Sequence, residues 1–438
     1  MRAVDIIIKK RDGGALSTAE IDFLIAGYTS GAIGDEQMAA WAMAVVLRGM
    51  DDRETTDLTL AMAHSGDTLD LHDIASLTVD KHSTGGIGDK TSLVLGPMLA
   101  AAGMTVAKMS GRGLGFSGGT IDKLESIPGF RAELSAEAFR AGVQRGLVIA
   151  AQSGDLAPAD KKLYALRDIT GTVESIPLIA ASIMCKKLAA GADCIVLDVK
   201  IGDGAFMRTI EDARRLARTM VAIGNRAGRR TAALISSMAQ PLGRAIGNAV
   251  EVREAIATLR GAGPADVLDL CALLGGELAV LAGQVATPEA GEALMRAVVA
   301  DRRALAALRA MVAGQGGDVA VIDDPTLLAS APTTLDLLAT RAGYLAVIDG
   351  AALGNAVNAL GGGRNRKGDA IDHRVGLTIH ARIGDVLAVG QPLVSIHAAS
   401  EAAAAGVADT LLAACTIVDA PVPAPPLVLE VVREGMTR

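Results

Sequence analysis

Two glycine-rich segments, each following a short run typical of a β-strand, constrain the fold of this chain most strongly. The first begins at Val79 and reads VDKHSTGGIGDKTSL, and the second begins at Ala107 and reads AKMSGRGLGFSGGT. Between them, the apolar segment Leu93–Ala102 predicts a helix that Gly103 ends, and Met104–Met109 predicts a second strand. Strand, helix and strand in so short a span indicate a βαβ unit with parallel strands. Both glycine loops should therefore leave the same edge of the sheet and face each other.

The two loops bring together several kinds of hydrogen-bond donor. Glycines let backbone N–H groups turn toward a ligand, and each helix that starts behind a loop favours an anion by about 0.3–1 kcal/mol. Ammonium and hydroxyl groups stand beside the glycines, with few acidic residues near them: Lys81, Ser83, Ser92, Lys108, Ser110 and Thr120. This combination predicts a site for a phosphate dianion. The alternative is that the glycines only form turns and the serines only cap helices.

Common nucleotide-binding motifs fit these loops poorly. A Walker A loop places lysine directly after glycine, whereas Asp89 separates Gly88 from Lys90 here. The second loop does contain a GxGxxG pattern, but Glu133, the acid about 20 residues further on, does not follow a strand as a dinucleotide site requires. A phosphate site is therefore favoured over a dinucleotide site.

Composition and charge narrow the class of protein. The chain has 438 residues, of which 50% are hydrophobic and 2% aromatic, which predicts two or three domains with finely packed, helix-rich cores. It has no apolar run long enough to span a bilayer and no signal peptide at its start, so we expect a soluble cytoplasmic protein without membrane contact. The net charge of −7 argues against binding of nucleic acid. The four cysteines lack CxxC spacing and predict reduced, mainly buried thiols: Cys185, Cys194, Cys271 and Cys415.

The fold class we predict is α/β, with a small all-helical lobe, a large α/β lobe with a mainly parallel sheet, and a β-rich C-terminal module. Residues 1–66 should form the helical domain, completed by 156–190. Three helices are expected between Ser17 and Ser65, because Ser17 with Glu20 and Asp51 with Glu54 have capping-box spacing. Trp41 should lie in the core of this domain.

The α/β domain should comprise residues 67–155 and 191–330. Ala192–Val199 and Thr231–Ser236 predict buried strands, and the first of them leads into a GDGAF loop at the ligand edge. Helices should follow up to Gly314. A boundary is expected near residues 323–332, and alternating β runs predict the separate C-terminal module at 340–438.

Two predicted helices carry polar groups suited to a flat heterocycle. Asp160–Asp168 predicts one helix, and Pro177–Ala189 predicts another, with Ser175 as its cap. Ser182 and Lys186 share a face of the second helix, and Arg167 near the end of the first supplies a planar guanidinium. Such groups can grip a polar ring. Taken alone, they fit a solvated surface better.

Long segments of the chain resemble the pyrimidine-nucleoside phosphorylase and thymidine phosphorylase family. The resemblance rests on KHSTGGIGDKTSL, on KMSGRGLGFSGGTIDKLESIPGF and on DLAPADKKLYALRDITGTVESIPLIAASIMCKKLAAGAD. The overall length and C-terminal layout agree, and GDVLAVGQPLVSIHA resembles the hammerhead-like module of that family. The resemblance implies reversible phosphorolysis of pyrimidine nucleosides (uridine, thymidine and deoxyuridine) to free base and a (deoxy)ribose 1-phosphate. It implies a homodimer with inorganic phosphate as co-substrate and no organic cofactor.

The resemblance also assigns roles to residues. Arg167, Ser182 and Lys186 match positions that bind the base, and Arg167 and Lys186 would take up the charge that accumulates on it. His82 matches an active-site histidine that can protonate or polarise the base, since the charge of a histidine can change near neutral pH. The six loop residues would hold phosphate beneath the sugar.

Several residues depart from the family pattern, indicate specificity or have no assigned role. Lys108 stands where enzymes narrowed to deoxynucleosides commonly have methionine, so we expect both uridine and thymidine to be accepted. Phe116-Ser117 replaces a usual His-Thr pair. Lys90 replaces a hydroxyl residue that helps bind potassium, so its ammonium can occupy a cation site whose implied ligands are Gly88, Leu242, Ala245 and Glu254. Asp203 has no role that we can assign.

Three other functions remain open from the sequence. A thymidine-restricted phosphorylase differs only in specificity. A phosphoribosyltransferase of related fold would need a diphosphate–metal site, for which Asp89 and Asp122 are the only nearby support. A nucleotide-binding regulatory protein would show no turnover. Apolar residues such as Met43 and Leu47 indicate that the helical lobe is the dimer surface.

Overall fold

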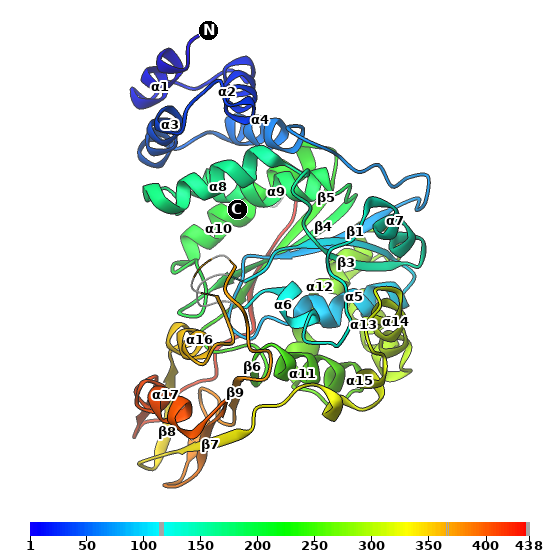
Figure 1. The fold of residues 1–438 in the computed structure, drawn as a ribbon, viewed down its shortest axis with the longest axis vertical. Coiled ribbons are helices and arrows are strands. Elements are labelled where there is room, and N and C mark those ends of the chain that lie inside the picture. Colours follow the sequence, from blue (N-terminus) through cyan, green and yellow to red (C-terminus); the bar gives the residue numbers. More distant parts are fainter. Residues whose placement is uncertain (114–117, 365, 367, 435–438) are drawn as a thin grey trace.

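The computed structural model describes residues 1–113, 118–364, 366 and 368–434. The molecule is elongated, with a helical lobe at one end, a twisted sheet in the middle and a smaller β-rich module at the other end (Figure 1). Within the described residues, no helix combines the length and apolar character needed to cross a membrane. Phe116 and Ser117 lie outside the described residues.

The N-terminal lobe contains the three predicted helices and one more. Their bounds are Ala3–Arg11 (α1), Thr18–Ser30 (α2), Asp35–Arg48 (α3) and Asp52–Ala63 (α4). Both predicted capping boxes are present, at Ser17 for α2 and at Asp51 for α4. The sequence did not predict α1, because its three consecutive isoleucines favour a strand as much as a helix.

Two later helices, α8 (Pro158–Thr170) and α9 (Ile176–Ala189), share a core with this lobe. Trp41 is fully buried in that core, as predicted, together with Leu163 and Cys185. Ser175 precedes α9, but its hydroxyl accepts no capping bond and is buried without a partner among the described residues. Ser175 is therefore the N-cap residue, as predicted, but its side chain makes no capping bond, and Pro177 removes one of the two N–H groups that such a bond can use.

The central sheet has six strands in the order β13-β5-β4-β1-β2-β3. The first five strands of the sequence run parallel, whereas β13 pairs antiparallel with β5 at one edge. The bounds are Thr78–Ser83 (β1), Thr105–Ser110 (β2), Leu147–Ala151 (β3), Cys194–Ile201 (β4), Arg230–Ser237 (β5) and Val428–Val432 (β13). Helix α5 (Thr91–Ala101) joins β1 to β2, so the predicted βαβ unit and parallel sheet are confirmed.

The strand order reverses direction at β1. The chain proceeds from β1 to β2 and β3 on one side, and then returns to place β4 and β5 on the other side. In open parallel sheets, ligands bind beyond the carboxyl ends of the strands at such a switch point. The loops that follow β1 and β4 lie side by side there, joined by a bridge between Gly86 and Ala205.

Helices cover both faces of the sheet (Figure 1). One core contains α5 and the later helices of the domain, and a second core on β4 and β5 contains α9 and α10. The helical run expected up to Gly314 is confirmed. The remaining bounds are Thr120–Leu124 (α6), Ala136–Gln144 (α7), Ile210–Arg226 (α10), Ala249–Leu259 (α11), Ala265–Leu281 (α12), Pro288–Ala300 (α13), Arg303–Gly314 (α14), Ala320–Asp323 (α15) and the 3₁₀ turn Pro325–Leu327.

The C-terminal module has two small sheets and two helices. The sheet orders are β10-β8-β12 and β6-β9-β11-β7. The bounds are Ala245–Gly247 (β6), Thr333–Leu338 (β7), Gly343–Ile348 (β8), Gly350–Ala359 (α16), Gly376–Ile379 (β9), Val386–Leu387 (β10), Pro392–Ala398 (β11), Glu401–Ala413 (α17) and Cys415–Val418 (β12).

The predicted limits of this module, 340–438, differ from the structure at both ends. Strand β7 begins earlier, β6 is contributed by the preceding domain, and β13 leaves the module to pair with the central sheet. An apolar alternation identifies a strand, but it does not identify the strand's partner.

Candidate active site

The first glycine loop is held tightly against a distant segment. Gly88 has φ +71°, and a Cβ atom at this position would lie 2.5 Å from the carbonyl oxygen of Leu242. Any side chain here would therefore push the loop away from that segment. The loop follows the carboxyl end of β1 and leads directly into α5.

The sheet brings the predicted phosphate residues to neighbouring positions. Lys81 and Ser83 lie toward the end of β1, and Lys108 and Ser110 lie toward the end of the adjacent parallel strand β2. Ser92 is in the first turn of α5, and Thr120 is the first residue of α6. The residues assigned from two separate loops therefore converge on one edge of the sheet.

The ammonium groups at this edge are already paired with buried carboxylates. Lys81 Nζ donates to Thr91 Oγ1 and lies 3.6 Å from Asp198 Oδ2 and 3.7 Å from Asp89 Oδ1. Lys108 Nζ donates to the carbonyl oxygen of Lys81 and lies 3.3 Å from Asp80 Oδ1. The expectation of few acidic partners is wrong.

For Asp198 the reason is the pairing of the strands, whereas Asp80 and Asp89 lie in the first glycine-rich segment itself. Ser83 of β1 pairs with Asp198 of β4, which is remote in sequence, so the carboxylate of Asp198 reaches Lys81 only in the folded sheet. The paired charges fix the lysines before any ligand arrives. A bound phosphate would therefore meet oriented donors with little reorganisation.

Burial and the neighbouring charges determine the protonation states of Lys108 and His82. Burial lowers the pKa of Lys108 to about 7, against the opposing effect of Asp80. The pKa of His82 lies well below its ordinary value, first because of burial and then because Lys187, Lys108, Lys81 and Lys186 repel its charged form. His82 is therefore neutral around pH 7 in the ligand-free chain, which favours polarising a base through a ring N–H over protonating it.

On the base side, α9 presents the predicted pair. Lys186 Nζ lies 3.1 Å from Ser182 Oγ and 2.5 Å from Asp160 Oδ2 of α8. Burial acts to lower the pKa of Lys186, but Asp160 more than offsets this effect and the pKa is raised. Lys186 thus keeps its positive charge, and Asp160 is an acidic partner that the sequence analysis missed.

Arg167 is more deeply engaged than the sequence indicates. Its side chain is almost fully buried, and Nε, Nη1 and Nη2 donate to the carbonyl oxygens of Thr172, Leu178 and Val173 at 3.1, 3.1 and 2.6 Å. It is therefore not a solvated surface arginine. A guanidinium has five N–H donors, so two remain for a ligand after the three that hold the α8–α9 connection.

A second residue missed by the sequence analysis joins the two halves of the site. Lys187 Nζ donates to Asp80 Oδ2 at 2.8 Å and to the carbonyl oxygen of Met109 at 3.1 Å. These bonds fix α9 to the middle of β1 and to the end of β2. The available signal was Lys186-Lys187 itself, because adjacent residues of a helix point about 100° apart, and in a mostly apolar helix one of two adjacent lysines is expected on a buried face.

The residues given as potassium ligands surround one point, and an ammonium group occupies it. Lys90 Nζ donates to the carbonyl oxygens of Leu242 and Ala245 at 2.8 and 3.0 Å and lies 2.5 Å from Glu254 Oε2. A Cβ atom on Gly88 would lie 3.4 Å from the same Nζ. The donor oxygens suit a monovalent cation, but with Lys90 in place they are already satisfied.

Asp203 stands apart from these contacts. Its carboxylate forms an ion pair with Arg208 at 3.0 Å, and both side chains are exposed.

Comparisons with known proteins define the class first. Residues 4–66 match the family model described as "Glycosyl transferase family, helical bundle domain", and residues 75–305 match "Glycosyl transferase family, a/b domain". The fold resembles the crystal structure of anthranilate phosphoribosyltransferase from Thermus thermophilus, with TM-score 0.60 and 22% identity over 72% of this chain and 99% of that one. The glycine loops at the switch point and the helical lobe therefore define an enzyme of the pentosyltransferase kind.

The particular family follows from closer relatives. Residues 344–418 match "Pyrimidine nucleoside phosphorylase C-terminal domain". The chain is 54% identical to the pyrimidine-nucleoside phosphorylase of Geobacillus stearothermophilus, and 53% identical to that of Bacillus subtilis (strain 168), each over 92% of this chain and 93% of the relative. The chain belongs to the pyrimidine-nucleoside phosphorylase family.

Proposed function

We propose that this enzyme catalyses the reversible phosphorolysis of uridine, thymidine and deoxyuridine to free base and (deoxy)ribose 1-phosphate. The observation that carries the proposal is a pair of ion-paired clusters that helix α9 joins. One runs from Lys108 through Asp80 to Lys187, and the other pairs the adjacent Lys186 with Asp160 on the base side. A nucleophile site and a leaving-group site are thus held together.

The reaction needs both sites. Breaking the N-glycosidic bond builds positive charge on the sugar and negative charge on the departing base. Ser83, Ser110 and the neighbouring lysines orient phosphate for attack at C1′. On the other side, Lys186 and the two remaining N–H groups of Arg167 stabilise the base as it leaves, and Ser182 orients the ring. His82, held neutral, polarises the base by hydrogen bonding.

An ultraviolet assay of base release tests this function. Uridine and thymidine should each lose their base only when inorganic phosphate is present, without added magnesium. Phosphate-independent or absent release would contradict the proposal. A requirement for diphosphate and magnesium would favour a phosphoribosyltransferase, and turnover of thymidine alone would favour the restricted enzyme.

Lys108 should determine whether a ribonucleoside is accepted. Lys108→Met removes an ammonium that can reach phosphate and the 2′ side of the sugar. We expect kcat/KM for uridine to fall by about 10- to 100-fold relative to thymidine, as for loss of one charged hydrogen bond. Parallel steady-state kinetics on both nucleosides measure this ratio, and an unchanged ratio would assign Lys108 to another role.

The same variant tests the pKa of Lys108. The ammonium is lost as pH rises through about 7, so its attraction for phosphate is present below this pH and fades above it. KM for phosphate should therefore rise between pH 6 and pH 8 more steeply in the wild type than in Lys108→Met. The ionisation of phosphate itself affects both proteins equally, so its effect on KM cancels in the comparison.

The cation site leads to a related proposal. We propose that Lys90 replaces potassium in this chain, supported by its contacts to Leu242, Ala245 and Glu254. The bound ammonium ties the start of α5 to the segment before α11. No added monovalent cation would then be needed to hold the first glycine loop.

A homodimer through the helical lobe is the remaining proposal. Apolar side chains are exposed on α1 and α3, two helices that pack against each other: Val4, Ile8, Met43, Val46 and Leu47. Arg48 Nε donates to the carbonyl oxygen of Arg11, so the two helices present one face.

Leu47 is the most exposed of these residues, at 73%, and tests the surface. Leu47→Glu should weaken dimerisation by about 2 kcal/mol or more, because a charge would be desolvated in the interface. Light scattering after gel filtration measures the mass over a range of concentrations. Val386 of the C-terminal module is similarly exposed, so Val386→Glu is the matched control and should leave the mass unchanged. A wild-type monomer would refute the proposal.

A further inference from the structure

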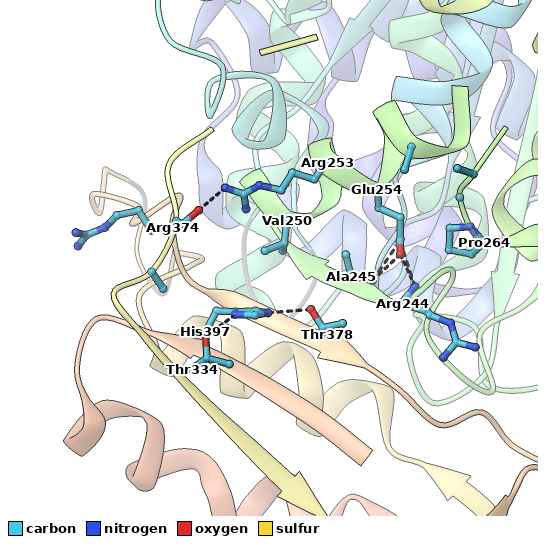
Figure 2. Close-up of a pocket in the computed structure, with 15 residues that line it drawn as sticks. Arg244, Ala245, Val250, Arg253, Glu254, Pro264, Thr334, Arg374, Thr378 and His397 are labelled. Atoms are coloured by element: carbon cyan, nitrogen blue, oxygen red, sulfur yellow. Dashed lines mark hydrogen bonds between the residues drawn. The ribbon is translucent and has the colours of Figure 1, made fainter. Parts of the chain in front are cut away.

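A second cavity lies at the junction between the α/β domain and the C-terminal module, apart from the candidate active site. Its volume is about 790 Å³, within the range of small-molecule sites. Helix α11 forms one wall, and strands β7, β9 and β11 of the module form the opposite wall (Figure 2). We call it the junction cavity.

Positive charge dominates the described lining of the junction cavity. Arg244, Arg253 and Arg374 line it, and Glu254 is the only carboxylate among the described lining residues. Glu254 is already satisfied, because its carboxylate accepts from Lys90 Nζ and from the backbone N–H groups of Arg244 and Ala245. Arg374 is paired with Asp372. The uncompensated charge therefore belongs to Arg244 and Arg253.

Arg253 is the group best placed to bind an anion. Its Nε and Nη2 donate to neutral acceptors only, the carbonyl oxygens of Pro325, Leu328 and Ala329 and the hydroxyl of Ser330. Its Nη1 has no partner among the described residues. A half-buried guanidinium without a counter-charge is stabilised by a bound anion.

Further donors face this arginine from the module. His397 lies between Thr378, at 2.8 Å, and Thr334, at 3.3 Å, on the wall opposite α11 (Figure 2). The pKa of His397 is lowered by burial and then by the charge of Arg253. The charge of Arg253 therefore acts on the imidazole at the opposite wall of the cavity.

The cavity is also larger than an inorganic ion requires. Val250, Ala257 and Pro264 add an apolar wall beside the charged groups. We propose that the junction cavity binds a small organic phosphate, with its phosphate group against Arg253 and the hydroxyls of Ser330 and Thr378, and its organic part against this apolar wall. Glu254 both lines the cavity and pairs with Lys90, which holds the first glycine loop. The occupant would therefore lie beside the carboxylate that anchors this loop.

Calorimetric titration of the full-length protein with ribose 5-phosphate tests the proposal. The active site also attracts phosphate, so the titration is repeated with Ser110→Ala, which affects that site alone. We expect a class of binding that Ser110→Ala leaves intact and that Arg253→Gln weakens by at least about tenfold. Inorganic phosphate should bind this class more weakly than ribose 5-phosphate.

Arg260→Gln is the matched control. Arg260 lies at the end of the same helix and also donates to linker carbonyl oxygens, those of Ile322 and Asp323, but it does not line the cavity. It should leave the affinity within about twofold. If Arg253→Gln fails to fold, Thr378→Val supplies the test, because it removes one cavity hydroxyl with almost no change of shape.

Three results would overturn the proposal. They are loss of all ribose 5-phosphate binding in Ser110→Ala, equal weakening by Arg253→Gln and Arg260→Gln, and equal affinity for inorganic phosphate and ribose 5-phosphate at the surviving site. Failure of the proposed phosphorolysis would instead appear in the base-release assay and would leave these titrations unaffected.

Discussion

Lys186→Gln should lower kcat for uridine phosphorolysis by about 10²- to 10³-fold, with KM for phosphate close to the wild-type value. The ammonium of Lys186 is held charged by Asp160 beside Ser182, and in the proposed reaction it stabilises negative charge that appears on the base only as the bond breaks. Removing one preorganised donor to a developing anion has an effect of this size. Steady-state release of uracil measures kcat, and circular dichroism verifies the fold.

Two further variants separate this role from a structural one. Lys162→Gln makes the same change on the neighbouring helix, where the ammonium packs over the ring of Tyr28, and should leave kcat unchanged. Asp160→Asn removes the group that raises the pKa of Lys186, so burial would lower that pKa and activity would be lost at lower pH than in the wild type. A kcat for Lys186→Gln within threefold of the wild type would contradict the proposed role of Lys186 in stabilising the leaving base.

Lys90→Met should destabilise the protein by about 3–5 kcal/mol, because it leaves the carboxylate of Glu254 and two carbonyl oxygens without their buried cation. Urea unfolding followed by far-ultraviolet circular dichroism measures the loss. Lys161→Met, a substitution of an exposed lysine, is the control and should change the midpoint little.

The dependence of the unfolding temperature on potassium tests the same site independently. The wild type should unfold at the same temperature in KCl and NaCl, whereas Lys90→Ser should be stabilised by KCl specifically. In the double variant Lys90→Met with Glu254→Gln, part of the lost stability should return, because no carboxylate is left unpaired. Wild-type stability that depends on potassium would show that Lys90 does not replace the ion.

The sequence predicted those parts of the fold that local signals determine. The apolar run before Gly103 and the strand that follows it defined the βαβ unit without reference to the rest of the chain. The capping boxes at Ser17 and Asp51 likewise marked helix starts through contacts only three residues long. These interactions depend on neighbours in the sequence, so their pattern is readable there.

The rest of the fold and of the candidate site depends on which strands pair. Asp198 reaches Lys81, and Lys187 reaches Asp80, only because β4 pairs with β1 and α9 packs on the strand ends. Periodicity shows that a residue is buried, but not what it meets. The resemblance supplied the candidate site residues, whereas the neutral state of His82 and the engaged guanidinium of Arg167 required coordinates.

The position of β13 has a consequence for biosynthesis. This strand covers the outer edge of β5, although a whole module separates the two in the sequence. While that module is being translated, β5 presents an open row of unpaired amide and carbonyl groups, the kind of surface on which nascent chains associate. Closure of the sheet is thus coupled to completion of a distant domain, and any delay there prolongs the interval in which the unfinished polypeptide is prone to aggregate.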